Sequence, residues 1–288
     1  MKFSEIKHKI KNLGNFKSLK EIKKAGLRII KNTKTGDYWL IEEEFLKPVV
    51  KSPRECKTIL IKPEDLKYKV LMVHKSKEEL KGKKVLDYIE WGEKQGFHKR
   101  PTCKSRKWWW GLPLIKPADY FWIMIIRDRF AVFYNKFHVY DDHTLGDILI
   151  KEENNNLDKN FCIVLNSTIF RLFLESLIRN YGGGGGPIAP QVYETEEFYI
   201  PDPFQINNNQ DNIKFNNFIN RKIKSTFIEL GFDPDKPIRE QEPKPLPDRK
   251  ALDDIVFDAL GLTEEERKEV YWAVGELVQN RLKKAKSV

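Results

Sequence analysis

The sequence predicts an α/β (α+β) fold that contains a long helix and a helical C-terminal tail. Short apolar runs bounded by proline, glycine or charged residues are typical of buried strands. Other stretches repeat apolar residues at helical spacing, most clearly in residues 161–181 and in the last forty or so residues. Strand-like and helix-like stretches alternate along the chain, which favours a mixed fold over an all-helical or all-strand one.

The N-terminal part, residues 1–35, is rich in lysine and is expected to be helical and then loop-like. Ser18 followed by Glu21 predicts a capping box at a helix start. Residues 38–41 (Tyr-Trp-Leu-Ile) predict a short strand, followed by a helical turn over residues 42–45.

The middle of the chain predicts a strand, a helix and a hairpin. The strand is expected within residues 66–74 and the helix over residues 85–95, which Gly96 should end. Residues 121–126 and 130–134 then predict two strands of a hairpin joined by a polar turn, Arg127-Asp128-Arg129.

Residues 161–181 predict one long helix, because their apolar side chains fall on one stripe. Five glycines, Gly182 to Gly186, follow, and we interpret them as a helix end rather than as a phosphate-binding loop. Residues 199–203 predict a short strand, and residues 215–230 predict a further helix.

The end of the chain predicts a linker and a helical tail. Residues 233–248 contain five prolines, which is typical of a linker. Thr263 and Glu266 predict a capping box between two tail helices. We therefore expect four segments: a basic segment 1–35, a recognition domain 36–235, a linker 236–250 and a tail 251–288.

The composition narrows the class of protein. The formal net charge is +10, which favours a polyanionic partner such as nucleic acid. Cys56, Cys103 and Cys162 are sparse and far apart, which argues against a zinc site or a disulfide framework. Neither a signal peptide nor a run of membrane-spanning length is visible, so we expect a cytoplasmic protein with no membrane partner.

The chemistry expected of an adenine-specific methyltransferase centre is missing. Such an enzyme needs a glycine-rich turn after a strand and an Asn-Pro-Pro-aromatic loop for the flipped base. The chain has no Pro-Pro pair, and its glycine cluster follows a predicted helix. We therefore expect no catalytic residue and no cofactor-binding residue in this chain.

One group could carry metal-dependent nuclease chemistry, namely Asp141, Asp142 and His143. A polar surface turn is the simpler interpretation, because the acidic pair and lysine of such nucleases are not found at the required spacing. We expect no metal site, and a metal-dependent nuclease remains an alternative function.

The densest functional signal is residues 94–110, which we call the basic–aromatic segment. It contains six Lys or Arg residues, no acidic residue and three consecutive tryptophans. Basic side chains neutralise phosphates, arginine reads guanine bidentately, and tryptophan stacks or anchors a loop. On a strand, three successive tryptophans would alternate faces and leave at least one exposed. The predicted DNA-binding residues here are Lys94, His98, Lys99, Arg100, Lys104, Arg106, Lys107 and Trp109.

The tip of the predicted hairpin is the second candidate surface. A two-stranded ribbon can enter the major groove and present its tip to the bases. Arg127, Arg129 and Lys136 are the DNA-binding residues predicted there, although an ordinary charged turn would look the same.

Several motifs occur in an order that resembles the C-terminal specificity domain of TaqI-like DNA methyltransferases. A glycine–aromatic basic loop (Gly96 to Arg100) leads to Arg106-Lys107-Trp108-Trp109, as in that family's loop and R-x-W strand. Leu165-Asn166-Ser167 is similar to the family's L-N-S helix start, and Ile200-Pro201-Asp202-Pro203 to its I-P-x-P strand end. The same L-N-S and I-P-x-P order occurs in type I restriction specificity subunits. The stretch from Asp248 to Thr263 looks like the tail of these methylases.

The resemblance implies a specificity domain with a mixed, curved sheet that holds double-stranded DNA and reads its sequence. A methyltransferase catalytic domain, in cis or in trans, would bind S-adenosylmethionine and methylate adenine. On this interpretation the chain is a fragment, a split subunit or an excised domain, with no catalytic activity of its own. The tail would dock on the methylase, unless it packs on its own domain. A basic assembly subunit that binds protein or RNA is the other alternative.

Overall fold

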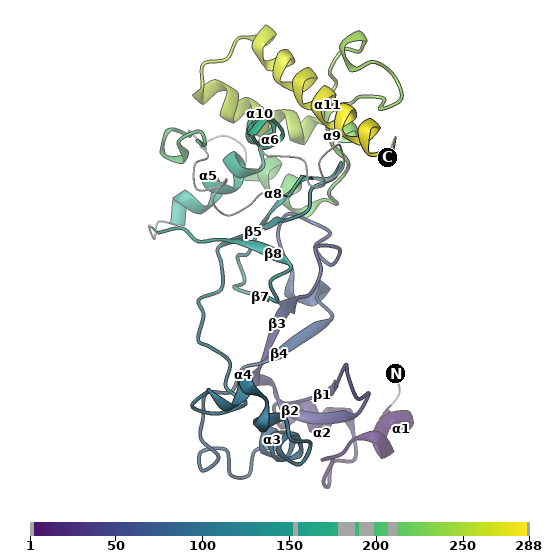
Figure 1. Cartoon of the computed structure of the whole chain (residues 1–288), viewed down its shortest axis with the longest axis vertical. Coiled ribbons are helices and arrows are strands. Elements are labelled where there is room, and N and C mark those ends of the chain that lie inside the picture. The colour runs from purple at the N-terminus through teal and green to yellow at the C-terminus, as the bar shows by residue number, and fades with distance from the viewer. Residues whose placement is uncertain (1–2, 152–154, 178–187, 190–198, 207–211, 287–288) are drawn as a thin grey trace. The chain divides into compact units, whose positions relative to one another are not determined.

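The computed structural model describes residues 3–151, 155–177, 188–189, 199–206 and 212–286 (Figure 1). The chain divides into two compact units. Unit 1 comprises residues 1–49 and 68–116, and unit 2 comprises residues 50–67 and 117–288. The division into four segments, which rests on composition and resemblance, stays a prediction beside these two units.

Unit 1 is built on short strands and one amphipathic helix. Strand β1 (Leu27–Lys31) pairs antiparallel with β2 (Tyr38–Glu42), and β3 (Leu46–Val50) pairs antiparallel with β4 (Tyr68–Leu71). The helices of this unit are α1 (Phe3–Ile6), η1 (Lys7–Lys9), α2 (Leu19–Lys24), η2 (Glu43–Phe45), α3 (Lys84–Lys94), η4 (Phe97–Lys99) and α4 (Pro101–Lys104).

Helix α3 packs on β2 through an aromatic cluster. Trp39 of β2 lies 5.2 Å from Tyr88 and 5.4 Å from Trp91 of α3 between ring centroids. The Glu42 carboxylate accepts hydrogen bonds from the backbone N–H groups of Lys84 and Val85. These donors are otherwise unsatisfied at a helix start, so β2 both caps and covers α3.

Unit 2 combines a three-stranded sheet with most of the helices. In its sheet, β5 (Tyr120–Ile123) lies between β6 (Val132–Tyr134) and β8 (Leu145–Ile148), with antiparallel pairing on both sides. The short strand β7 (Tyr140–Asp141) leads to Asp142, whose N–H donates to the carbonyl of Val50. The helices are η3 (Pro63–Asp65), α5 (Asn155–Leu165), α6 (Thr168–Leu177), η5 (Pro203–Gln205), α8 (Asn212–Asn220), α9 (Thr226–Leu230), η6 (Ile238–Glu240), α10 (Pro247–Ala259) and α11 (Glu264–Lys286).

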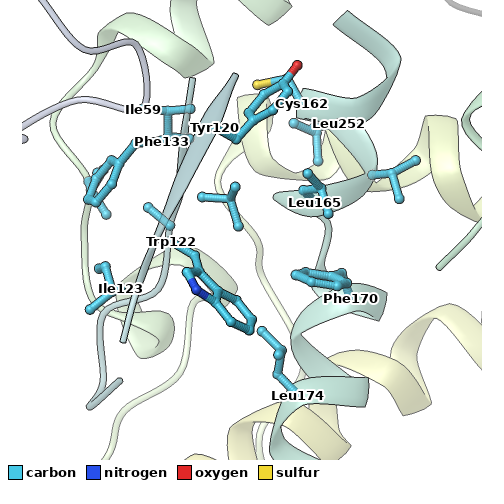
Figure 2. Close-up of a cluster of buried hydrophobic side chains, with 14 of the residues drawn as sticks. Ile59, Tyr120, Trp122, Ile123, Phe133, Cys162, Leu165, Phe170, Leu174 and Leu252 are labelled. Carbon is cyan, nitrogen blue, oxygen red and sulfur yellow. The ribbon is translucent and has the colours of Figure 1, made fainter. Parts of the chain in front are cut away.

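The core of unit 2 lies between this sheet and helices α5, α6 and α10. Figure 2 shows Tyr120 and Trp122 of β5 facing side chains of α5 and α6 such as Leu165 and Phe170. Gly146 of β8 lies opposite Trp122, and a Cβ at Gly146 would come within 1.6 Å of the indole nitrogen. Only glycine therefore fits there, and the indole fills the space above the neighbouring strand.

The α+β class and the C-terminal helices are confirmed. The strand at Tyr38–Glu42, the helix at Lys84–Lys94 and the β5–β6 hairpin also lie where they are expected. Both capping boxes form: Glu21 N–H donates to the Ser18 hydroxyl at 3.2 Å, and Glu266 N–H donates to the Thr263 hydroxyl at 3.3 Å. Strand β1 is not predicted by the sequence, because its apolar residues lie within a lysine-rich stretch.

The single long helix expected over residues 161–181 is wrong in its described part. The chain forms two helices that break at Asn166 and Ser167. The Asn166 side chain bonds both backbone groups of Val132, and the Ser167 hydroxyl accepts from Phe170 N–H, which starts α6. Gly182 to Gly186 lie outside the described residues.

Two further expectations are wrong. The helix expected over residues 215–230 is interrupted between α8 and α9, where Ser225 caps α9. Residues 199–203 form no strand and lead into η5. In both places a side-chain oxygen accepts a backbone N–H and starts a new short helix: Asp202 caps η5 and Ser225 caps α9.

The tail packs on its own unit. Val274 and Val278 of α11 are fully buried in the unit 2 core, and Arg281 bonds Glu175 of α6. Residues 236–250 are also held, since the N–H groups of Lys244 and Leu246 donate to carbonyls of α9. This arrangement matches the alternative in which the tail packs on its own domain.

Across the described ranges, no single helix is long and apolar enough to cross a membrane. Only Asp158–Leu165 and Thr168–Leu177 taken together pass that test, as a pair bent by 55°.

Candidate nucleic-acid interface

The basic–aromatic segment begins where α3 ends. Gly96 has a φ of 75°, a left-handed conformation that favours glycine, and its N–H donates to the Glu93 carbonyl at 2.8 Å. The chain then reverses into η4, and Pro101 occupies the first turn of α4, where its missing N–H costs nothing. Two short helical turns therefore display residues 97–104 beside the end of α3.

Trp109 anchors the other end of the segment on α3. Its indole N–H donates to the Glu93 carboxylate at 3.0 Å. Its ring covers Gly92, where a Cβ would come within 2.5 Å of the ring. A side chain at position 92 would displace this ring, so Gly92 and Trp109 form a matched pair.

The tryptophans do not lie on a strand, so that expectation is wrong. Residues 105–110 form bends and turns, closed by a hydrogen bond from Gly111 N–H to the Trp108 carbonyl at 2.8 Å. All three rings are half-buried. Trp108 and Trp110 stack at 6.5 Å between centroids, and Trp109 meets Trp110 edge-on. No ring is fully exposed, because the turn folds them against one another and against α3.

Cations of the segment contact aromatic rings rather than form ion pairs, although Lys107 lies within electrostatic reach of Glu79. None of its six Lys and Arg side chains has an ion pair within the part of unit 1 that the structure describes. Arg106 is half-buried, and the other five are exposed, namely Lys94, Lys99, Arg100, Lys104 and Lys107. Arg100 lies over the Phe97 ring at 4.4 Å, and Lys107 lies over the Trp108 ring at the same distance. Such contacts orient a cation without neutralising it.

The neighbouring acid is already neutralised. Glu93 accepts a hydrogen bond from Lys77 at 2.6 Å in addition to the one from Trp109. Burial alone would raise the pKa of Glu93, but the bonds from Lys77 and Trp109 outweigh burial and lower it. The sequence does not identify Gly92, Glu93 and Lys77 as part of this site. The only signal is that Gly92 and Glu93 lie about one helical turn before Gly96, the expected helix end.

His98 is the remaining predicted residue of this segment. It is half-buried, with its ring 6.5 Å from that of Trp109. Its Nδ1 is buried and has no hydrogen-bond partner in the described structure. Because this nitrogen is buried, a ligand cannot reach it in this structure, and any contact made by His98 comes from the rest of its half-buried side chain.

The other predicted residues belong to unit 2. Arg127 is exposed, whereas the Arg129 guanidinium donates to the carbonyls of Pro53 and Cys56 at 3.3 and 3.1 Å. Lys136 is exposed and lines a cavity of about 370 Å³ with Asp119, Tyr134, Asn135, His138 and Asp158. The structure therefore distributes the predicted residues over two units.

The acidic group at residues 141–143 is occupied by local bonds. Asp141 accepts from the backbone N–H of His143 at 2.7 Å, and Asp142 pairs with Lys51 at 3.3 Å. Within the described ranges, no group of three His, Cys, Asp or Glu residues is arranged to hold a metal ion. These contacts match the surface-turn interpretation of this group.

The described residues also do not fit an S-adenosylmethionine site. No strand in this part of the chain runs directly into a glycine-rich turn that opens a helix. We assign no methyl-transfer step to these residues.

Comparison with known proteins yields a matching family model and similar solved structures. The family model described as "Type II methyltransferase M.Eco57I, C-terminal domain" matches residues 30–230. Among solved structures, the type IIG restriction endonuclease BpuSI is similar, with a TM-score of 0.53 at 14% identity. The match covers 84% of this chain and 27% of that chain, so this chain spans about a quarter of the length of BpuSI. No curated protein matches.

Proposed function

The chain belongs to the family of C-terminal domains of the type II methyltransferase M.Eco57I, and we therefore propose that it recognises double-stranded DNA. It acts as the specificity part of an adenine-specific methyltransferase of a restriction–modification system. The methyl transfer itself is performed by a catalytic part that binds S-adenosylmethionine.

The observation that carries this proposal is the unpaired charge of the basic–aromatic segment. Its six cations form no ion pair in the described part of unit 1, although that unit contains many acidic residues. A cluster of unpaired cations repels itself and is stabilised when phosphates replace its counterions. The Trp109 ring, which packs on Gly92 and bonds Glu93, forms what we call the aromatic base of the segment. This base fixes the backbone that carries the cations, which reduces the entropy lost on binding.

The side chains divide by chemistry. Lysine is a mobile point charge, so Lys94, Lys99, Lys104 and Lys107 contact phosphates. Arginine presents a planar fork that bonds guanine in the major groove, so Arg100 and Arg106 are the base-reading candidates. His98, which is half-buried, and Arg127, which is exposed, supply further contacts.

Selection of duplex DNA from a random pool by the purified chain, near physiological salt, tests this function. Enrichment of one short sequence supports a specificity domain and identifies the target. Salt-sensitive binding without enrichment contradicts the sequence-reading role and leaves a basic scaffold. Absence of binding overturns the proposal and favours an assembly subunit.

The adenine assignment needs its own test. DNA modified by the complete methyltransferase is digested to nucleosides, and the methylated base is identified by mass spectrometry. N6-methyladenine at the selected sequence supports the assignment, and methylcytosine overturns it while leaving DNA recognition intact.

A further inference from the structure

Three segments of unit 2 that are far apart in the sequence lie side by side. They are residues 53–57, residues 127–129 and residues 222–226. The Arg129 side chain donates to the carbonyls of Pro53 and Cys56, and Ile223 N–H donates to the Lys57 carbonyl at 3.0 Å. The N–H and hydroxyl of Thr226 both donate to the Asp128 carbonyl, at 2.8 and 2.5 Å.

The central segment is also fixed from inside the unit. Arg171 of α6 and Arg281 of α11 both donate to the Arg127 carbonyl, at 3.1 and 2.7 Å. These two buried arginines share the carboxylate of Glu175. The turn at residues 127–129 is therefore held by side chains from three helices, and its conformation does not depend on a ligand.

Each of the three segments contains exposed cations. None of them forms an ion pair or a side-chain hydrogen bond within the described residues of unit 2. They are Arg54, Lys57, Arg127, Lys222 and Lys224. The other arginines of the described part of this unit behave differently, because all of them bond carboxylates or backbone carbonyls.

Two of the acids around these cations bond to other groups, whereas one carboxylate oxygen of Glu55 has no partner in the described structure. Glu55 accepts from Lys51 N–H at 2.9 Å, and Glu229 binds the guanidinium groups of Arg221 and Arg249. Asp128 is half-buried and lies within electrostatic reach of Arg171. The five cations outnumber the neighbouring carboxylates of Glu55 and Asp128, so the protein itself compensates their positive charge only in part.

We propose that Arg54, Lys57, Arg127, Lys222 and Lys224 form a phosphate-contacting surface for duplex DNA, the three-segment patch. This inference rests on the proposed function and adds a second contact region, on unit 2, to the basic–aromatic segment of unit 1. Three of the five residues are lysines, which neutralise phosphates but do not read bases in a fixed geometry. The patch contributes affinity and register, and sequence reading belongs elsewhere.

The sequence alone did not reveal this surface. Of its members only Arg127 stood out, because the other four are ordinary cations separated by more than 160 residues of chain between Lys57 and Lys222. Their approach depends on hydrogen bonds between distant segments.

Two triple variants of the full chain test the patch. One replaces Lys57, Lys222 and Lys224 by glutamine. The matched control replaces Lys236, Lys250 and Lys268, which are exposed lysines of the same unit that pair with Asp233, Asp254 and Glu242. Both changes lower the formal net charge from +10 to +7, since each removes three lysines. The binding of a mixed-sequence duplex is measured by fluorescence anisotropy between about 50 and 200 mM salt.

The patch variant should bind at least about tenfold more weakly than the control. The slope of log Kd against log salt should fall by about 2 to 3, because each lost phosphate contact removes about 0.9. Thermal unfolding should match the wild type, since the changed side chains are exposed.

The possible failures are distinguishable. Equal binding by the two triple variants overturns the patch. If neutralising Arg106 and Lys107 still weakens binding in that case, the proposed function stands without the patch. A wild-type chain that binds no duplex overturns the proposed function and the patch together. An affinity loss that does not change with salt also overturns the patch, because phosphate contacts release counterions.

Discussion

The cations of the basic–aromatic segment in unit 1 and the buried arginines of unit 2 differ in how their charge is paired. In unit 2, the side chains of Arg171 and Arg281 are 4% exposed, and both bond Glu175, whose side chain is 1% exposed. In unit 1, Arg100 and Arg106 have no carboxylate partner in the described structure, and Arg100 lies over a ring instead. A buried cation must be paired to be tolerated, whereas an exposed one can be left for a ligand.

A net charge of +10 is therefore a poor guide to the location of a binding surface. The arginines of unit 2 are largely engaged in internal bonds. A second network there joins Arg221 to Glu229 and Asp248, and Arg249 to Glu229 and the Asn166 carbonyl. Only the cations that these bonds leave unpaired are candidates for phosphate contacts.

The buried network should respond most strongly to substitution. Glu175→Gln removes the carboxylate shared by Arg171 and Arg281 and leaves two uncompensated guanidinium groups. Burial already lowers the pKa of Arg171 to about 10, which shows how costly its charge is there. We expect a loss of about 3 to 5 kcal/mol in the free energy of unfolding, measured by urea titration with far-UV circular dichroism.

The control for that change is Glu269→Gln, which removes an exposed partner of Arg239. It should cost less than about 1 kcal/mol. Similar losses for the two variants would contradict the contrast between buried and exposed pairs.

The aromatic base of unit 1 should be the next most sensitive region. Trp109→Ala removes the ring over Gly92 and the bond to Glu93, and should cost about 3 kcal/mol. Trp109→Phe, which keeps a ring, should cost about 1 kcal/mol. Unchanged stability combined with weaker duplex binding would mean instead that this ring stacks on DNA.

The second network of unit 2 should make stability depend on acid. Burial raises the pKa of Glu229, but the bonds from Arg221 and Arg249 outweigh burial and hold this pKa below its ordinary value of 4.5. The contribution of Glu229 is therefore fully present above about pH 4.5 and is lost as the pH falls through the lowered pKa of the folded state. Urea titrations across acid pH should show a shallower fall in the free energy of unfolding for Glu229→Gln. A fall as steep as that of the wild type would exclude this residue as the source.

A single arginine of the basic–aromatic segment should affect binding only. Arg106→Ala should weaken duplex binding about tenfold, or about 1.4 kcal/mol, with unchanged thermal unfolding. Arg28→Ala is the control in the same unit, because Arg28 is already paired with Glu43 at 2.7 Å. Equal affinity of the two variants would mean that Arg106 does not contact DNA.

The weakest response is expected where one phosphate contact is lost. Lys104→Gln should change Kd only a few-fold, but should reduce the salt slope by about 0.9. Lys83→Gln, which removes a half-buried lysine paired with Glu44, should leave the slope unchanged. Anisotropy titrations over a salt series separate these outcomes, and equal slopes would exclude Lys104.

Local signals predict the fold where the deciding contacts are local. The capping boxes at Ser18 and Thr263 form because their partners lie three residues away. The prediction of one long helix is wrong because Asn166 bonds Val132, which lies 34 residues earlier. The Asn-Ser pair does carry a signal, since both residues favour helix ends.

The sequence predicts which residue types make up the candidate site, but not the contacts that fix their conformation. The cation run and the tryptophans of residues 94–110 are visible in the sequence. Their turn conformation depends on Gly92 and Glu93, and on Lys77, whose approach to Glu93 no periodicity reveals. The three-segment patch cannot be predicted from the sequence, because each of its members looks like an ordinary surface cation.

The chain passes between the two units at three places: after Val49, after Lys67 and after Lys116. An engineer who wishes to exchange the basic–aromatic segment together with its supporting unit cannot therefore use a single crossover. A chimaera that keeps both cores whole needs three matched junctions, and a simple truncation at any of them leaves one core without a strand or a loop that it contains. On the proposed function, exchange of a short surface segment such as residues 97–107 is the practical route to a changed DNA preference.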